Sequence, residues 1–170
     1  MNPIQSISTA KLNSHVTIEQ TAKGRGVFAT QKFAQGETVV VGIPIEKVTE
    51  RTIYSFQIDF DLHINLDEPA VVINHSCSPN TGVRNNQFGG YDFVALEDIA
   101  AGEEITWDYE TTEYESIAVL RCLCGSLSCR GQTLGFKFRE QMLRDTYKEY
   151  IAGYLKISSE THESRLLSRD

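Results

Sequence analysis

Four cysteines stand out as residues that could do chemistry together. Cys122, Cys124 and Cys129 follow one another with one and then four residues between them, and the remaining cysteine is Cys77. Four thiols with none to spare is the ligand count of a tetrahedral, all-cysteine zinc site. We therefore expect a structural zinc ion, and not a catalytic one, because four thiolates leave no open position on the metal.

Two other fates for these thiols stay open. Disulfides are the first, although residues 1–20 show no secretion signal and the protein is expected inside the cell, where thiols stay reduced. Cys122 and Cys124 are also poorly spaced to pair with each other. Unrelated core thiols are the second. Gly125 and Gly131 supply the turns that tight ligand clusters use, which favours zinc.

Three further segments carry residues that could bind a ligand. Residues 23–29 contain a Gly-x-Gly turn that would let a ligand approach the backbone closely, but they lack the third glycine and the helix of a dinucleotide-binding fingerprint. Residues 73–80 place an asparagine and a histidine among short polar side chains, which indicates a buried, hydrogen-bonded loop. Residues 101–109 indicate a turn and then a short strand with two aromatic side chains on one face. Each segment alone is also compatible with a structural role.

Together these segments resemble the SET-domain family of lysine methyltransferases. The resemblance covers most of residues 16–135 and rests on two specific motifs, Asn-His-Ser-Cys-x-Pro-Asn at residues 74–80 and Gly-Glu-Glu-x-x-x-Asp-Tyr at residues 102–109. A cysteine cluster of the kind called post-SET follows them. The resemblance implies a fold of short β-sheets in which the two motif segments lie side by side in a knot-like crossing. It also implies S-adenosylmethionine as the cofactor.

The resemblance further implies roles for individual residues. Tyr109 matches the family's catalytic tyrosine, and Trp107 would line the substrate channel with it. Asn74 and His75 would hold the adenosine, His75 through its backbone, and the Gly-x-Gly turn would contact the methionine part. The expected cofactor-binding residues are Lys23, Gly24, Arg25, Gly26, Tyr54, Asn74, His75 and Leu134, and the expected zinc ligands are Cys77, Cys122, Cys124 and Cys129.

The chain departs from the family pattern at several positions. Val71 stands where many members have an arginine, Trp107 where they usually have Phe or Tyr, and Leu134 where some place an aromatic ring over the cofactor. The cysteine-rich pre-SET region is absent, and the insert between residues 48 and 70 is short. The surfaces that usually read the substrate sequence are therefore expected to be reduced.

Strands are the main elements expected to position these residues. Apolar runs at residues 16–18, 26–29 and 38–41, separated by glycines, predict short strands, and residues 91–96 predict another. The strict alternation from Tyr54 to Ile64 predicts one strand. Late in the chain, apolar residues recur at spacings of three and four, which predicts a C-terminal helix. The fold class is therefore mostly β (α+β).

These signals divide the chain into five parts. We expect an N-terminal extension at residues 1–15, the SET domain at 16–117, the zinc-binding post-SET segment at 118–135, the C-terminal helix at 136–157 and a disordered tail at 158–170.

Composition limits the partners. Lys plus Arg number 16 against 23 Asp plus Glu, for a net charge of -7, so the basic face that nucleic acid requires is not expected. No apolar run approaches the roughly 20 residues of a membrane-spanning helix. An acidic protein speeds its encounter with a basic one, which favours a basic protein or peptide with an exposed lysine as the partner. The expected location is intracellular, in the cytoplasm or nucleus.

We expect methyl transfer to the ε-amine of a lysine in a histone or another basic protein. The amine must be uncharged to attack, and a narrow, dry aromatic channel would lower the lysine pKa and fix the approach. No dedicated side-chain base is evident, so deprotonation through water is expected. Two alternatives stay open: a cofactor-binding SET pseudoenzyme acting as an interaction module, and a methyltransferase for a small amine or amino acid.

Overall fold

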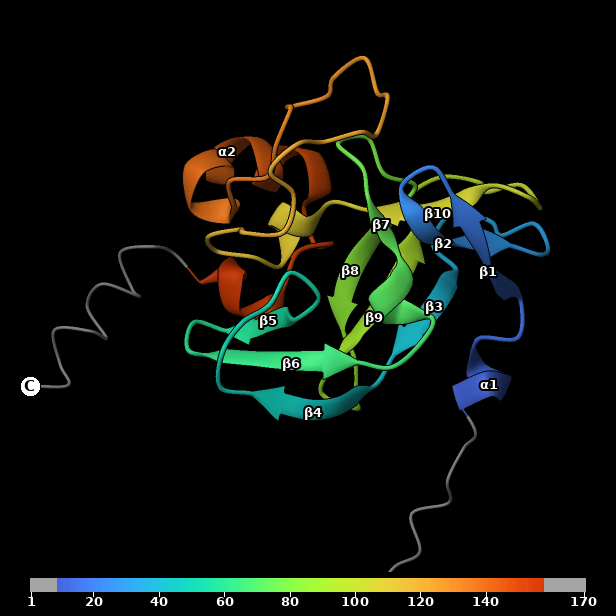
Figure 1. Cartoon of the computed structure of the whole chain (residues 1–170), viewed down its shortest axis with the longest axis horizontal. Coiled ribbons are helices and arrows are strands. Elements are labelled where there is room, and N and C mark those ends of the chain that lie inside the picture. The colour runs from blue at the N-terminus through green and yellow to red at the C-terminus, as the bar shows by residue number, and fades with distance from the viewer. Residues whose placement is uncertain (1–8, 158–170) are drawn as a thin grey trace, which may run out of the picture.

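The computed structural model describes residues 9–157, which form three small β-sheets with short helical segments around them (Figure 1). The first sheet has the strand order β1-β2-β10-β7. β1 (Val16–Thr21) and β2 (Gly24–Ala29) form an antiparallel hairpin. β10 (Glu104–Trp107) pairs antiparallel with β2 and parallel with β7 (Asn74–His75). The parallel pair places the two motif segments side by side, as the resemblance implied.

The other two sheets have three strands each. In sheet order they are β3 (Thr38–Gly42), β9 (Tyr91–Ala95) and β8 (Thr81–Asn85), then β4 (Pro44–Val48), β6 (Leu62–Leu66) and β5 (Phe56–Asp59). The helical segments are α1 (Thr9–Leu12), α2 (Phe136–Tyr147) and the 3-10 turns η1 (Ala70–Val72), η2 (Tyr109–Thr111) and η3 (Gly153–Lys156). The mostly β class with one C-terminal helix is confirmed.

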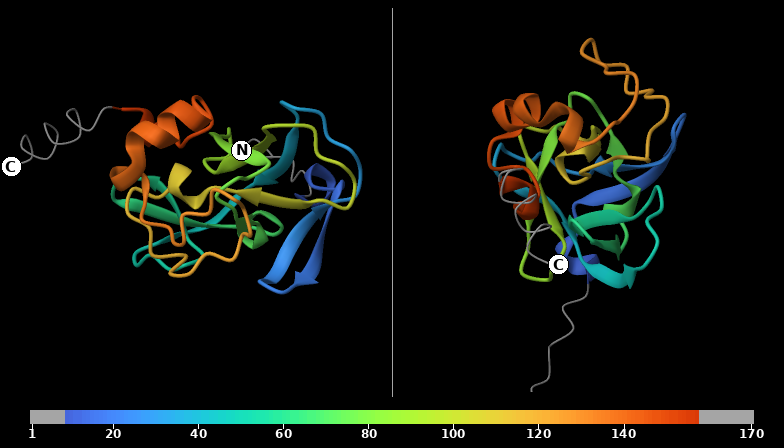
Figure 2. Two further views of the ribbon diagram at one scale, coloured as in Figure 1. Left: turned by 90° about the horizontal axis from the view of Figure 1, so that it is seen from above. Right: turned by 90° about the vertical axis from the view of Figure 1, so that its left-hand side faces the viewer.

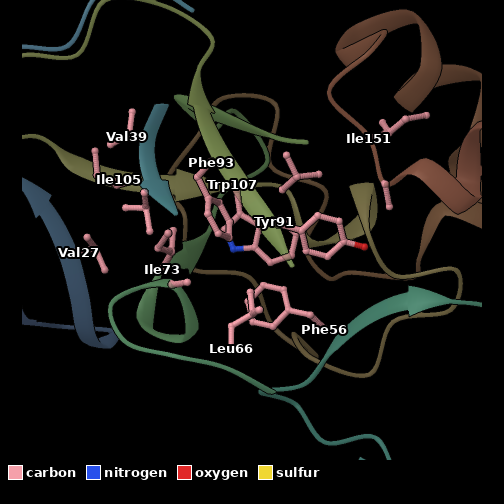
Figure 3. Close-up of a cluster of buried hydrophobic side chains, with 14 of the residues drawn as sticks. Val27, Val39, Phe56, Leu66, Ile73, Tyr91, Phe93, Ile105, Trp107 and Ile151 are labelled. Atoms are coloured by element: carbon pink, nitrogen blue, oxygen red, sulfur yellow. The ribbon is translucent and has the colours of Figure 1, made fainter. Parts of the chain in front are cut away.

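The hydrophobic core lies where the sheets meet. Alternate residues of β2, β6, β9 and β10 are buried in it, and Trp107 at the end of β10 fills the space between sheets (Figure 3). Its indole stacks on Phe56 at a centroid distance of 5.3 Å and meets the edge of Phe93 at 5.6 Å. Aromatic pairs of this geometry add to area burial. The strand that leads into Tyr109 is therefore fixed against β5.

The single strand predicted from Tyr54 to Ile64 is wrong. A two-residue turn at Phe60 and Asp61 separates β5 from β6, and the two strands pair antiparallel. Phe56 lies opposite Ile64, so both still face the same side, and the alternation continues through the turn. The period in the sequence therefore could not reveal the turn. Tyr54 itself lies in a turn before β5 and is 65% exposed.

The C-terminal helix is shorter than the predicted residues 136–157. α2 ends at Tyr147, because Lys148 adopts a left-handed backbone with φ of 52°. The chain then bends back, and the backbone N–H of Ala152 donates a hydrogen bond to the carbonyl of Thr111 at 2.9 Å. Ile151 and η3 still pack on the same core, although they lie outside α2. The spacing of apolar residues therefore continues past the end of the helix.

Part of the predicted organisation lies outside residues 9–157. The predicted tail 158–170 and residues 1–8 of the N-terminal extension are not described by the structure. Within the extension, the Asn13 side chain donates to the carbonyl of Val41 at 3.0 Å and accepts from its N–H at 2.8 Å, which attaches this segment to β3. Between residues 9 and 157, no helix is long and apolar enough to cross a membrane.

Candidate functional site

A cavity of about 700 Å³ is lined by residues from each of the segments singled out in the sequence. This volume lies within the usual range for small-molecule sites, roughly 300–1,000 Å³. One wall comes from the β1–β2 turn, η1, β7 and the end of β10. A second wall comes from the segment that leads into the cysteine cluster, and residues 52–56 with Glu113 line the rest. The lining residues fall at 23–25, 52–56, 71–75, 107, 109, 113, 117–119 and 121–123.

Most of the expected site residues reach this cavity. Lys23, Gly24, Arg25, Tyr54, Asn74, His75, Trp107 and Tyr109 all line it. Gly26 and Leu134 are not among the lining residues. A Cβ on Gly26 would lie 3.1 Å from Asn74 Nδ2 and 2.9 Å from Glu104 Oε1, so this glycine permits close packing beneath the cavity. Leu134 donates its backbone N–H to buried Glu110, and Leu123 lines the cavity where the cysteine segment meets it.

Asn74 joins three segments at the cavity floor. Its Nδ2 donates to Glu104 Oε1 at 2.8 Å and to the carbonyl of Arg25 at 3.0 Å. Lys23 forms an ion pair with the other oxygen of Glu104 at 2.8 Å. Both amide protons of Asn74 are thus used, while its Oδ1 accepts no hydrogen bond from residues 9–157. This oxygen remains as an acceptor for a ligand.

Gly24 opens the backbone to the cavity. Its φ of 104° lies in the left-handed region that side chains rarely adopt, and no atom lies within 4 Å of the position a Cβ would take. A ligand can therefore reach the turn that Lys23 and Arg25 flank.

Tyr109 is held from two sides. Its backbone N–H donates to His75 Nδ1 at 3.3 Å, and its hydroxyl donates to the carbonyl of Ile73 at 2.9 Å. Burial, with a contribution from Arg130, lowers the pKa of His75 to about 4, so the imidazole is neutral and can accept. Burial raises the pKa of Tyr109 above its ordinary value, so the ring remains a phenol. The lone pairs of its hydroxyl oxygen are left for a substrate.

Aromatic rings line the cavity beside Tyr109. Its ring lies 4.7 Å from that of Trp107, which stacks on Phe56. Trp107 Nε1 is buried and has no hydrogen-bond partner among the described residues. Phe56, Glu113 and Arg121 also line the cavity and were not expected from the motifs, because tertiary packing alone brings them there.

The four cysteines form one cluster. Their Sγ atoms all lie within 4.8 Å of one another, and Cys77 and Cys122 are 3.9 Å apart. All four are free thiols. Zinc–sulfur bonds of about 2.3 Å in a tetrahedron place sulfurs roughly 3.8 Å apart, so this donor set fits zinc. The backbone N–H of Arg130 also donates to Cys77 Sγ at 3.3 Å.

A buried ion network ties the cysteine cluster to the segment that carries Tyr109. Arg130, next to Cys129, makes two hydrogen bonds to Asp108 at 2.6 and 2.7 Å. The Tyr147 hydroxyl of α2 donates to the same carboxylate at 2.9 Å. Asp108 precedes Tyr109, so the cysteine segment and α2 both brace the backbone that presents the tyrosine.

Comparisons with known proteins agree with this geometry. A model of the SET domain family matches residues 24–110. Methyltransferase flvH of Aspergillus flavus is 29% identical over 78% of this chain and 76% of its own length. The H3 lysine-4 specific histone-lysine N-methyltransferase of Saccharomyces cerevisiae is 29% identical over 62% of this chain, but only 12% of its own.

A solved structure agrees as well. The crystal structure of KRYPTONITE in complex with mCHG DNA and SAH superposes with a TM-score of 0.55 and 26% identity. The match covers 69% of this chain and 28% of that one. The chain spans a minor part of this neighbour and of the yeast enzyme, and most of flvH. On the family model and this geometry, the chain belongs to the SET-domain family of methyltransferases.

Proposed function

We propose that this protein transfers a methyl group from S-adenosylmethionine to the ε-amine of a lysine in a protein substrate. One observation carries the proposal: both motif segments and the Gly-x-Gly turn meet at a single cavity around Tyr109. A pseudoenzyme would have no need to keep this tyrosine braced by His75 and Ile73.

The cavity residues suit the cofactor. The free Oδ1 of Asn74 would accept from the adenine amino group, and the open backbone at Gly24 would receive the methionine part. When bound, S-adenosylmethionine supplies the electrophilic methyl group. Arg121 is the one basic lining residue without a hydrogen bond or ion pair within residues 9–157, because Lys23 pairs with Glu104 and Arg25 with Glu68. We assign it to the cofactor carboxylate, in the place of the arginine that Val71 replaces.

The aromatic wall would prepare the amine. Phe56 and Trp107 exclude water, which lowers the pKa of an entering lysine ammonium, and Tyr109 offers an oxygen acceptor that orients the amine. The net charge of -7 supports a basic protein as the substrate.

The cysteine cluster would hold a structural zinc ion. Cys77, Cys122, Cys124 and Cys129 supply four thiolates, which complete a tetrahedral site and leave no position for chemistry. Arg121 and Leu123 flank Cys122 and line the cavity. Metal binding would therefore organise the second wall of the cofactor site.

A small amine or amino acid is the second candidate substrate. The match covers 76% of flvH, which is named only as a methyltransferase. It covers only 12% of the yeast histone enzyme. Incubation with labelled S-adenosylmethionine, a lysine peptide library, a lysate and a set of free amines separates the two, with products identified by mass spectrometry. Label on peptides or proteins supports the proposal, label only on small amines supports the second candidate, and no label on any of them contradicts both.

A further inference from the structure

Glu113 is the only carboxylate among the residues that line the cavity. It lies four residues after Tyr109, and its backbone N–H donates to the Tyr109 carbonyl at 3.0 Å. The residue is only 7% exposed, so its charge is not solvated as a surface carboxylate would be. Burying a carboxylate charge is costly unless the charge is paired or hydrogen-bonded, so a poorly paired carboxylate in a cavity is a candidate functional group.

One oxygen of this carboxylate is held and the other is not. Oε1 accepts from the backbone N–H of Gln57 at 2.9 Å and from the Thr112 hydroxyl at 3.4 Å. Oε2 accepts no hydrogen bond from the described residues, and it lies 3.9 Å from Nε2 of His63. Burial and nearby Arg51 lower the pKa of that histidine, which favours its neutral form.

The remaining polar groups packed near Glu113 have their protons committed elsewhere. The Tyr91 hydroxyl of β9 donates to the carbonyl of Gln57 at 2.6 Å, and the Tyr154 hydroxyl of η3 donates to the carbonyl of Thr112. Arg51, which faces it from the loop before β5, donates to the carbonyl of Glu115 at 2.7 Å. Among residues 9–157, His63 is therefore the only side chain within 4 Å that could form an ion pair with Glu113, and its Nε2 is 3.9 Å away.

Burial raises the pKa of Glu113 to about 7, against the opposing effects of Gln57 and Arg51. A carboxyl with this pKa is ionised about half the time at neutral pH and can both take up and release a proton. Such a value in a cleft is the property expected of a general base.

We propose that Glu113 accepts the proton that the substrate ammonium loses before methylation, an inference that rests on the proposed function. An N–H bond of the ammonium breaks, its electron pair stays on nitrogen, and the proton forms an O–H bond at Oε2. The products are a neutral amine and a neutral carboxylic acid, so no other reactant is needed. Glu113 later returns the proton to solvent. This route replaces the deprotonation by water alone that the sequence suggested.

Glu113→Gln separates this role from a structural one. The amide keeps an oxygen that can accept from Gln57, so the link to β5 survives, while the charge and the basicity are lost. Glu115→Gln is the matched control, because Glu115 is two residues away, exposed, and paired with Lys137 on the surface.

The first experiment uses n-butylammonium, a probe of the lysine side chain that stays charged over the whole range. Calorimetry would follow its binding to protein saturated with S-adenosylhomocysteine between pH 5.5 and 8.5. We expect the wild type and Glu115→Gln to bind the probe about tenfold more tightly at the higher pH, as Glu113 ionises. Glu113→Gln should bind weakly and without pH dependence. Equal binding of n-butylammonium by all three proteins, or no binding by the wild type, would overturn the proposal. If the wild type still binds S-adenosylhomocysteine in that case, the proposed function stands.

Two further readouts keep the proposal testable if Glu113→Gln does not fold. Carbon-13 NMR of the wild type labelled at glutamate carboxyls should show one group titrating near pH 7, and no such group would overturn the proposal. On a peptide that the wild type methylates, kcat should rise with pH and level off near 7. A wild type that binds no S-adenosylhomocysteine would instead contradict the proposed function, and this inference with it.

Discussion

The two walls of the cavity are built differently. The sheet-side wall is folded into paired strands: Asn74 and His75 lie on β7 beside β10, and their side chains are hydrogen-bonded to neighbouring segments. The cysteine-side wall, residues 117–123, contains no helix or strand, and the loop it enters projects from the sheets (Figures 1 and 2). Leu123 on this wall is 63% exposed, and Arg121 has no partner within the described chain.

This difference shows which parts of the site folding alone can position. Burial and strand pairing fix the sheet-side wall before any ligand binds. The cysteine-side wall depends on its attachment points, which are the thiol cluster and the pair between Arg130 and Asp108. We therefore expect cofactor affinity to respond to metal, and the catalytic geometry to respond to the buried ion pair.

Arg130→Met tests the attachment that both walls share. The change leaves Asp108 buried without the Arg130 nitrogen that bonds both of its oxygens, which costs about 3–5 kcal/mol in the free energy of unfolding. Denaturant unfolding measures this loss. Arg84→Met is the control, because Arg84 forms an exposed pair with Asp92 and should cost less than about 1 kcal/mol. Equal losses in the two variants would mean that the Arg130 pair does not brace the fold.

Tyr109→Phe tests the chemistry on the sheet-side wall. It removes one hydroxyl and keeps the ring, so we expect turnover to fall by on the order of 10²-fold while affinity for S-adenosylhomocysteine changes little. Transfer of labelled methyl to a verified substrate measures the rate. Tyr150→Phe, at a partly buried position away from the cavity lining, should turn over normally. Full activity in Tyr109→Phe would place the chemistry elsewhere.

Cys124→Ser tests the cysteine-side wall by removing one thiolate. We expect the protein to lose about one zinc per chain and to bind S-adenosylhomocysteine roughly tenfold more weakly. Hydrogen exchange should accelerate in residues 118–133 and stay slow in β10. Ser128→Ala, beside Cys129, should retain the metal. A metal-free wild type with the same exchange pattern would remove zinc from the account.

Arg121→Ala tests a single contact on that wall and has the smallest expected effect. Affinity for S-adenosylhomocysteine should fall a few-fold, because one exposed charge pair is lost. Affinity for 5′-methylthioadenosine, which lacks the carboxylate, should not change. An equal loss for both ligands would show that Arg121 shapes the wall without meeting the carboxylate.

The sequence predicted the sheet-side wall better than the rest of the site. Asn74, His75 and Tyr109 belong to two motifs that are each a short continuous stretch of sequence, and the paired strands bring the two motifs together as expected. Glu113 and Arg121 lie outside the two motifs, and they reach the cavity only through the tertiary fold, so the sequence did not indicate them. Leu134, which the resemblance places at the cofactor, is not among the lining residues, and its backbone N–H donates to Glu110, a contact that no periodicity could show.

Calorimetry of the wild type and of Asn74→Ala with S-adenosylhomocysteine tests the central claim most directly. We predict one binding site per chain in the wild type. Asn74→Ala should bind at least about fivefold more weakly, since loss of a buried polar contact costs roughly 1 kcal/mol. No binding by the wild type, or unchanged affinity in Asn74→Ala, would contradict the assignment of this cavity to the cofactor.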